Sequence, residues 1–347
     1  PLSRHCTELV DRAHDFVRLL MNGDGLGEVA LGASSSQLCL MLADAYGKVL
    51  QRGDEIVIAE AGHEANVGPW ARLAERGATI RTWRVDPDSG RADLAGLAEA
   101  LSERTRLVAF PHVSNLLGEI VDVEAATRLA HEVGARVVVD GVAYAPHRAM
   151  DVAAWGVDWY TYSVYKVYGP HMGALFGTHE AFADVEGPNH FFIPKDDIPY
   201  KFEVGGVSHE GCAGLLALGD YLRFLAGHDA LTRQTIVEAF DVMRACEHPL
   251  LERLLGWLRE HPRARIVGPD TPGPDRVGTV SFLHAEKPSA EIARAAHQAD
   301  IAIRNGHMYA WRQCDAMGID PADGVARCSF VHYNTPDEMD RFVEVLD

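Results

Sequence analysis

Between residues 30 and 180 the chain alternates short apolar runs with longer amphipathic stretches, and this alternation constrains the fold more than any other feature. The apolar runs predict strands at EIVIAE (55–60), TIRTWRV (79–85), RLVAFPH (106–112), ARVVVD (135–140) and WYTYS (159–163). The amphipathic stretches predict helices at 35–50, 64–76, 91–102 and 121–133. Strands that alternate with helices form βαβ units and a mostly parallel sheet, so the predicted fold class is α/β.

After about residue 187 the pattern changes, which indicates a second domain. A loop with several proline, asparagine and aspartate residues (187–200) leads to a long helical region (211–260). The remainder predicts strands near 277–283 and 326–331 and helices near 288–299 and 336–346. A chain of 347 residues is also too long for one small core. We therefore predict a large domain over 1–228 and a smaller C-terminal α+β domain over 229–347.

Charge and cysteine content argue against several classes of partner. Nucleic acid is not expected, because a phosphate backbone needs a basic face and the net charge is −18. No apolar run approaches the ~18 residues that span a bilayer, so no membrane partner is expected. The six cysteines form no CxxC pair and no zinc-ligand spacing, which predicts no metal site, reduced thiols and a cytoplasmic location. The N-terminal segment is no signal peptide and reads as the middle of a helix, which leaves open whether earlier residues are missing.

Polar residues that follow the predicted strands are the candidates for a site, because parallel sheets bind ligands at the carboxyl ends of their strands. This rule selects His112, Ser114, Asn115, Asp140 and the segment around Lys166. Lys166 is one of five lysines and lies among aromatic and apolar residues in YTYSVYKVYGPHMGALFG. A desolvated lysine has a lowered pKa and becomes an amine nucleophile for Schiff-base formation. The alternative is a lysine that extends its charged end from a half-buried strand end into water.

Two further segments favour a phosphorylated pyridine cofactor. Asp140 ends a strand, where a carboxylate can hold a pyridinium N–H, although it can also simply cap a turn. The segment LGASSSQLCLML (31–42) reads as the end of a strand and places Ser34 and Ser35 at the start of a predicted helix, with Gln37 completing a capping box. Helix N-termini bind phosphate, but an ordinary helix start explains the same residues.

Four other residues are candidates for ring or carboxylate binding. His63, in AGHEANVGPW, can stack its flat ring on a pyridine ring. Asn115, in HVSNLLGEI, can donate a hydrogen bond to a ring hydroxyl or to a substrate carboxylate. Arg327, in VARCSF, and Arg304, in AIRNGHMYAW, can clamp a carboxylate with two hydrogen bonds. A loop residue with its hydrogen bonds satisfied, or a surface arginine, is the alternative in each case.

Together these elements resemble the class V aminotransferase family, the group that includes the cysteine desulfurases. The resemblance covers the chain from about residue 25 to the end. SVYKVYGPHMGALFG is similar to the family's Ser-x-His-Lys-x-x-Gly-Pro-x-Gly pattern. HEANVGPW, SNLLGEI and RCSFVHYNT resemble three other family segments, and DGVAYAPH, SHEG and GHMYA resemble a cysteine desulfurase-like branch.

The resemblance implies a fold type I enzyme that uses pyridoxal 5′-phosphate (PLP). It implies that Lys166 forms the internal aldimine, that Asp140 pairs with the pyridinium nitrogen and that His63 stacks on the ring. It also implies phosphate binding by Ser34 and Ser163. Arg327 would bind the carboxylate of an amino-acid substrate. The family pattern further implies a homodimer with shared active sites, in which FEVGG (202–206), ending in Gly206, reaches the partner's phosphate site.

Departures from the family pattern concern the reaction. Ala143 takes the place of a glutamine, Tyr165 of a histidine and Gly206 of a threonine. Desulfurases carry Arg-x-Gly-His-x-Cys in a late loop, whereas here Arg304-Asn-Gly-His307-Met-Tyr309 ends in tyrosine. Tyrosine cannot form a persulfide, so His307 and Tyr309 become candidates for proton transfer or substrate contact. Histidines near the other motifs suit proton transfer as well, namely His112, His171, His209 and His332.

We therefore expect an enzyme that forms an external aldimine with an amino acid and labilises a bond at Cα, by transamination or β-elimination. We do not expect a persulfide-forming cysteine desulfurase. One alternative is an O2- and PLP-dependent oxidative decarboxylase, which converts a glycyl-nucleoside-like amino acid to a carboxamide. Another alternative is a PLP-binding regulator without catalytic activity. The sequence identifies neither the substrate side chain nor the use of oxygen.

Overall fold

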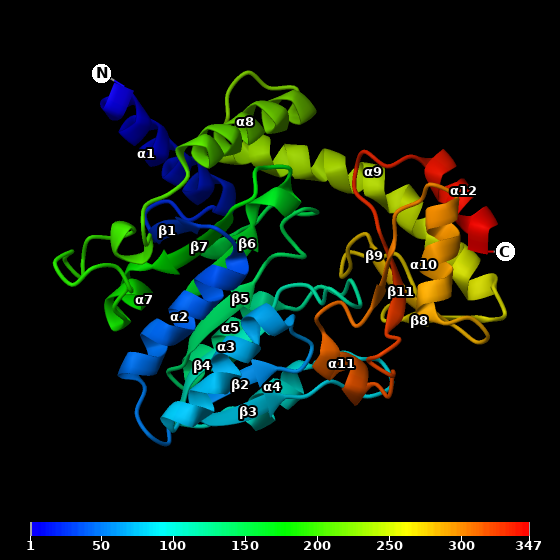
Figure 1. Cartoon of the computed structure of the whole chain (residues 1–347), viewed down its shortest axis with the longest axis horizontal. Coiled ribbons are helices and arrows are strands. Elements are labelled where there is room, and N and C mark those ends of the chain that lie inside the picture. The colour runs from blue at the N-terminus through cyan, green and yellow to red at the C-terminus, as the bar shows by residue number, and fades with distance from the viewer. Residues whose placement is uncertain (1, 347) are drawn as a thin grey trace.

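The computed structural model describes residues 2–346, which form two sheets with helices around them (Figure 1). The α-helices are α1 (Leu2–Met21), α2 (Ser35–Val49), α3 (Gly68–Ala71), α4 (Leu94–Ala100), α5 (Val123–Glu132), α6 (Val152–Trp155), α7 (His179–Asp184), α8 (His209–Ala226), α9 (Arg233–Glu260), α10 (Ser289–Gln298), α11 (Trp311–Ala316) and α12 (Pro336–Leu346). Short 3₁₀ turns are η1 (Glu64–Asn66), η2 (Arg72–Arg76), η3 (Val164–Val167) and η4 (Tyr200–Phe202).

The larger sheet has seven strands in the order β1-β7-β6-β5-β4-β2-β3. These strands are β1 (Gly27–Gly32), β2 (Glu55–Ala59), β3 (Thr79–Trp83), β4 (Thr105–Pro111), β5 (Arg136–Asp140), β6 (Trp159–Ser163) and β7 (Gly173–Thr178). The five strands from β3 to β6 are parallel, while β7 runs antiparallel between β6 and β1. The α/β class with a mostly parallel sheet is therefore confirmed.

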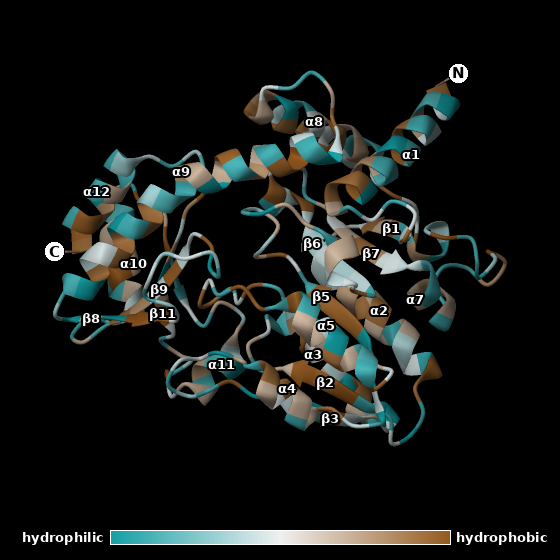
Figure 2. Cartoon of the chain, turned by 180° about the vertical axis from the view of Figure 1, so that it is seen from behind, coloured by the Kyte–Doolittle hydropathy of each residue, from teal (hydrophilic) through white to brown (hydrophobic). Residues whose placement is uncertain are grey.

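Side chains of the larger sheet alternate between two cores, because successive residues of a strand point to opposite faces. Val137 and Val139 of β5 join a core with α1, α4, α5, α8 and the first half of α9. Val138 joins the opposite core with α2, α3 and α7. The sheet is thus covered on both faces, which explains its continuously apolar strands. In Figure 2, β2 and β5 are brown, whereas α1 and α9 alternate between teal and brown.

The C-terminal part contains a four-stranded antiparallel sheet in the order β10-β11-β9-β8. Its strands are β8 (Ala264–Val267), β9 (Thr279–His284), β10 (Arg304–Gly306) and β11 (Val325–Ser329). Helices α10, α12 and the second half of α9 pack on it in a third core. Helix α9 therefore serves two cores: Met243 belongs to the first, and Leu250 belongs to the third. The proposed division at residue 228 lies before this helix and stays a prediction.

The sequence predicted β2 to β6 within two residues and the end of β1, but it did not predict β7 as a strand. β7 follows β6 after nine residues that contain the turn η3 but no α-helix, so the alternation of strands and helices stops there. The expected helical region 211–260 divides into α8 and α9, because Gly227 ends α8 in the left-handed conformation with φ 71°. Within residues 2–346, no helix combines the length and apolar character needed to cross a bilayer.

Candidate active site

The candidate lysine and aspartate lie at the ends of neighbouring parallel strands. Asp140 is the last residue of β5, and it pairs in register with Thr161 of β6. Two residues after Thr161, β6 ends at Ser163, and the turn η3 that follows carries Lys166. The fold therefore brings Asp140 and Lys166 to one edge of the sheet, as predicted for ligand-binding residues.

Burial affects Asp140 and Lys166 in opposite directions. Only 6% of Asp140 is exposed, and burial raises its pKa against the smaller lowering effects of His63, Lys166 and one backbone bond. That bond is donated by Val142 N to Asp140 Oδ1 over 2.9 Å. Part of the Lys166 side chain is exposed to water. Surrounding protein atoms nevertheless desolvate its amine and lower its pKa, and the positive charge of Arg327 lowers the pKa further. The lysine that the sequence selected is thus partly desolvated.

The His63 ring occupies the same region, and its neighbours fix which nitrogen is free. His63 Nδ1 accepts a hydrogen bond from Ala65 N at 3.0 Å. In the neutral ring the proton therefore resides on Nε2. Desolvation lowers the pKa of His63, against the opposing charge of Asp140. The ring is consequently a flat, neutral surface with one donor.

Serines from two elements meet at the N-terminus of α2. Ser34 is the N-cap, and its Oγ accepts from Gln37 N at 3.1 Å, as the capping box predicted. Ser35 Oγ and Ser163 Oγ are 2.8 Å apart, which joins the start of α2 to the end of β6. This approach requires Gly173, because a Cβ there would lie 2.3 Å from the backbone of both Ser34 and Ser35. The result is a polar cradle at a helix N-terminus, where free N–H groups favour phosphate.

Arg327 and Asn115 contact each other next to this edge. Arg327 Nη1 donates to the Asn115 carbonyl oxygen at 2.9 Å, while Arg327 Nε is buried without a hydrogen-bond partner. Burial lowers the pKa of Arg327, and Arg304 lowers it further. Arg304 lies directly across from Arg327 in the β10–β11 pairing. Two guanidinium groups on adjacent strands repel each other, so an anion bound between them would reduce the electrostatic repulsion.

The loop from Arg304 to Ala310 lies against the large domain. Asn115 Nδ2 donates to Met308 O at 2.6 Å, and Glu64 N donates to Tyr309 O at 2.9 Å. The Tyr309 ring stacks on His63 with centroids 5.1 Å apart and planes 30° apart. His307 Nδ1 accepts from Tyr309 N at 3.1 Å. Tyr309 therefore lies beside the His63 ring, and His307 contacts Tyr309.

Comparison with known proteins identifies the family. The profile described as "Aminotransferase class-V" matches residues 1–342. The chain is 35% identical to the aminotransferase-like protein FGM3 of Gibberella zeae, over 99% of this chain and 84% of that protein. It is 33% identical to a probable cysteine desulfurase of Streptomyces coelicolor, over 100% of this chain and 82% of that protein. An apo cysteine desulfurase from Thermococcus onnurineus superposes with a TM-score of 0.86 at 26% identity, covering 100% of this chain and 84% of that one.

The chain belongs to the aminotransferase class-V family. Members of this family depend on PLP, so the protein is a PLP-dependent enzyme of fold type I. The residues described above fit that cofactor. Asp140 is a buried carboxylate without an ion-pair partner in residues 2–346, and a protonated ring nitrogen is the cation that it lacks. The cradle of Ser34, Ser35 and Ser163 suits a phosphate group.

Gln313 lies near the candidate active site, and sequence reasoning missed it. Its side chain is fully buried, Oε1 accepts from Ser114 Oγ at 3.0 Å, and Nε2 donates to Gly90 O at 3.0 Å. These bonds attach α11 to two loops of the large domain. Leu116 and Leu117 pack with Cys314 in a separate apolar cluster at the same junction. No motif pointed to Gln313, because both of its partners are distant in sequence.

Two of the histidines suggested for proton transfer, His112 and His332, contact tyrosine side chains. His112 is buried and stacks on Tyr144 with centroids 3.6 Å apart and planes 8° apart. Its Nδ1 lies 2.9 Å from the hydroxyl of Tyr160, and desolvation lowers its pKa well below the usual value. His332 Nε2 lies 2.5 Å from the Tyr221 hydroxyl. Their contacts are thus with other aromatic residues rather than with Lys166.

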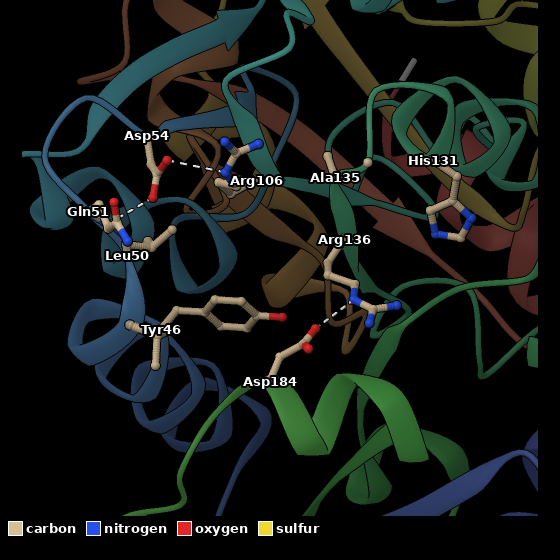
Figure 3. A pocket seen from close by; sticks show the side chains of 11 residues that line it. Tyr46, Leu50, Gln51, Asp54, Arg106, His131, Ala135, Arg136 and Asp184 are labelled. Carbon is tan, nitrogen blue, oxygen red and sulfur yellow. Dashed lines mark hydrogen bonds and ion pairs between the residues drawn. The ribbon is translucent and has the colours of Figure 1, made fainter.

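A pocket of about 590 Å³ lies where the parallel strands begin, and it contains none of the predicted site residues. Figure 3 shows its charged residues facing each other in pairs. Arg106 Nε donates to Asp54 Oδ1 at 3.2 Å, and Arg136 Nε donates to Asp184 Oδ2 at 2.7 Å. Because these charges are neutralised within the chain, the pocket provides no group for the chemistry of this family.

Proposed function

We propose that this enzyme binds an amino acid and labilises a bond at its Cα, with transamination or β-elimination as the outcome. The observation that carries the proposal is the placement of Lys166 and Asp140 at adjacent strand ends, where Asp140 is buried and the amine of Lys166 is partly desolvated. A lysine with a lowered pKa is a nucleophile towards an aldehyde. A carboxylate at this place has the charge that a protonated pyridine nitrogen needs.

The chain's own residues then have distinct roles. PLP, when bound, supplies an electron sink for the negative charge that develops at the substrate Cα. Lys166 Nζ holds the cofactor and afterwards accepts and returns the proton at Cα. Asp140 keeps the ring nitrogen protonated, and His63 packs against the ring. Ser34, Ser35 and Ser163 bind the phosphate through hydroxyl groups and the N-terminus of α2.

Arg327 is the proposed ligand of the substrate carboxylate, and Arg304 and Asn115 support it. The buried Nε of Arg327 has no hydrogen-bond partner, so a carboxylate would satisfy it. Asn115 holds the guanidinium through its carbonyl oxygen. Arg304, on the facing strand, supplies a second positive charge. A bidentate contact of this kind fixes the orientation of the amino acid.

We further propose that the enzyme does not form a persulfide. The position that carries cysteine in the desulfurase pattern is Tyr309. Cys314 is fully buried, and desolvation raises its pKa to about 11. Cys328 is buried in the C-terminal core, and desolvation raises its pKa to about 12. Thiol attack requires a thiolate, so neither residue suits that chemistry.

Incubation with cysteine and a reductant tests this part of the proposal. We expect no protein-bound persulfide, and any sulfide release should be slow and unchanged in Cys314→Ser. Rapid sulfide release that Cys314→Ser abolishes would contradict it. Slow release that does not depend on Cys314 would indicate direct β-elimination.

A screen of amino acids, aerobic and anaerobic, with product analysis by mass spectrometry tests the reaction class. A keto acid or an eliminated leaving group in both atmospheres supports the proposal. A carboxamide formed only with oxygen would identify an oxidative decarboxylase instead. Binding of PLP without turnover of any amino acid would identify a regulator.

We also propose a homodimer in which Gly206 from the partner subunit contributes to each phosphate site. The loop before Gly206 exposes large apolar side chains: Phe191 is 96% exposed, Phe192 69% and Val204 51%. Contact with a second copy would cover them. Sedimentation of the holoenzyme tests the assembly, and a fully active monomer would contradict it.

A further inference from the structure

The carboxylate of Glu203 is a buried junction between three segments. Glu203 is 6% exposed, and its Oε1 accepts hydrogen bonds from His14 Nε2 at 2.6 Å and from Leu31 N at 2.8 Å. His14 belongs to α1, and Leu31 is the penultimate residue of β1. One side-chain oxygen therefore joins the N-terminal helix, the edge strand and the loop after η4.

Two of these segments lead into proposed phosphate sites, one into the site of this chain and the other into that of its partner. Leu31 precedes Gly32, Ala33 and the N-cap Ser34, so its position sets where the cradle begins. On the other side, Glu203 precedes Gly205 and Gly206, which have φ of 78° and 83° and belong to the loop proposed to reach the partner's phosphate site. A pocket of about 250 Å³ is lined by residues from both segments, Gly32 and Gly206 among them.

The loop that carries Glu203 is itself held firmly. Lys201 is 1% exposed, and its ammonium donates to three carbonyl oxygens, those of Asn189 at 3.1 Å, His190 at 2.9 Å and Ile193 at 3.0 Å. Asn189 Nδ2 also donates to Glu203 O at 3.2 Å. The backbone that carries Glu203 is therefore held in place, and the hydrogen bond from Leu31 N to its carboxylate fixes the position of Leu31.

His14 holds a proton at this junction. Its Nδ1 faces the Val10 carbonyl oxygen at 2.9 Å, which can only accept, so Nδ1 is a donor. Its Nε2 faces the Glu203 carboxylate. If the carboxylate is ionised, both ring nitrogens donate and His14 is an imidazolium. Burial alone would lower the pKa of His14, but the hydrogen bond and charge of Glu203 outweigh burial and raise it.

We propose that Glu203 is a positioning residue for the PLP phosphate site, and that the proton on His14 maintains this arrangement. The inference rests on the proposed cofactor site at the N-terminus of α2. Glu203 acts through the backbone of Leu31 and through its own loop, without touching the cofactor. The arrangement loosens when His14 loses its proton, because a buried carboxylate then faces a nitrogen lone pair.

The pH dependence follows from the raised pKa of His14. Stability from a raised pKa is fully present below the unfolded value, near 6.5, and is lost as the pH rises through the folded value. The other groups that face the pair are Arg18 on α1, which opposes protonation of His14, and Cys212 on α8, next to Glu203. The phosphate site is therefore expected to loosen at alkaline pH.

Three variants of the holoenzyme test the proposal. Glu203→Ala removes the contact with Leu31, and we expect PLP release to accelerate by about tenfold or more. Glu203→Gln keeps an acceptor for Leu31 and gains a donor for neutral His14, so it should hold the site without alkaline loosening. Glu28→Gln is the matched control, because Glu28 also links α1 to β1, through Arg18 Nη1 at 2.6 Å, but at the far end of the strand.

Two measurements distinguish the outcomes. The first is the rate of PLP release, followed by absorbance, and the second is hydrogen exchange of the peptide covering 26–38. At alkaline pH we expect this peptide to exchange faster in the unmodified enzyme than in Glu203→Gln, and equally below neutral pH. Equal PLP release in Glu203→Ala and Glu28→Gln would overturn the proposal, as would identical pH profiles for the unmodified enzyme and Glu203→Gln. If the unmodified protein did not bind PLP at all, the proposed cofactor site would be wrong. The hydrogen-exchange comparison would in that case still test the contact between Glu203 and Leu31.

Discussion

The two edges of the large sheet contain the same kinds of charged residue but arrange them differently. Where the parallel strands begin, Arg136 is paired with the carboxylate of Asp184 and with a second aspartate (Figure 3). Where they end, Lys166, Asp140 and the adjacent Arg327 of β11 have no ion-pair partner in the part of the chain that the structure describes. The first edge satisfies its charges within the chain, and the second leaves them for a ligand.

Unsatisfied polar groups are costly in a folded protein, so their location is informative. Buried atoms without a hydrogen-bond partner occur in several places, and two of them, Arg327 Nε and Asn115 Oδ1, lie next to the edge where the strands end. In a site that binds a charged cofactor and substrate, such groups stay unpaired until the ligands bind, although this lowers the stability of the ligand-free protein. Substitutions at the two edges should therefore affect different properties, activity at one and stability at the other.

The largest expected effect is that of Lys166→Ala. We expect turnover to fall by at least about 10³-fold, since the nucleophile and the proton carrier are lost together. Borohydride should attach PLP covalently to Lys166 in the unmodified enzyme and to no residue in the variant, as measured by peptide mass spectrometry. Lys48→Ala, which changes an exposed lysine of α2, should retain full labelling and activity. Full activity in Lys166→Ala would contradict the assignment.

Asp140→Asn should retain PLP but lower turnover by about 10²-fold or more, because the neutral amide no longer stabilises a protonated ring nitrogen. The same substitution should not lower the stability of the apoprotein. Burial raises the pKa of Asp140. Ionisation therefore opposes folding at pH values above the usual aspartate range, and the apoprotein of the variant should be at least as stable at neutral pH. Thermal unfolding of both apoproteins measures this, and near-normal turnover would remove Asp140 from the mechanism.

The sequence predicted much of the edge where the strands end, and the reason is local. Asp140 ends a strand and Lys166 follows one, the apolar character of both strands is visible in the sequence, and Ser34 has a recognisable capping box. The contacts of Glu203 and Gln313 were not predictable in this way, because their partners are 172 and 199 residues away. Pairing over such separations depends on tertiary packing, which periodicity and propensity do not encode. The antiparallel β7 was missed for a different reason, because it follows β6 with no α-helix between them and the alternation of strands and helices stops there.

At the opposite edge, Arg136→Met should affect stability alone. Arg136 Nη1 donates to Asp158 Oδ1 at 2.7 Å, and only 3% of the Asp158 side chain is exposed. Removal of the guanidinium leaves that carboxylate with fewer partners, at an expected cost of about 1–3 kcal/mol. Denaturant unfolding measures the change, and kcat/KM for the folded holoenzyme should stay unchanged. A loss of activity larger than the loss of folded protein would show that the two edges are coupled.

The smallest expected effect is that of Tyr309→Phe, which tests whether the tyrosine at the cysteine position acts through its ring or through its hydroxyl. The ring stacks on His63, and the backbone of Tyr309 is held by Glu64 N and His307 Nδ1. Phenylalanine keeps the ring and both backbone contacts, so we expect kcat and KM to change by less than about threefold. Tyr309→Ala removes the stack, and because such aromatic pairs contribute about 0.5–1.5 kcal/mol, it should cost about two- to tenfold. If turnover by Tyr309→Phe instead falls by about 10²-fold or more, which is within the range of general acid–base catalysis, the hydroxyl transfers a proton. In that case the edge where the strands end would contain one more catalytic group than its unpaired charges indicate.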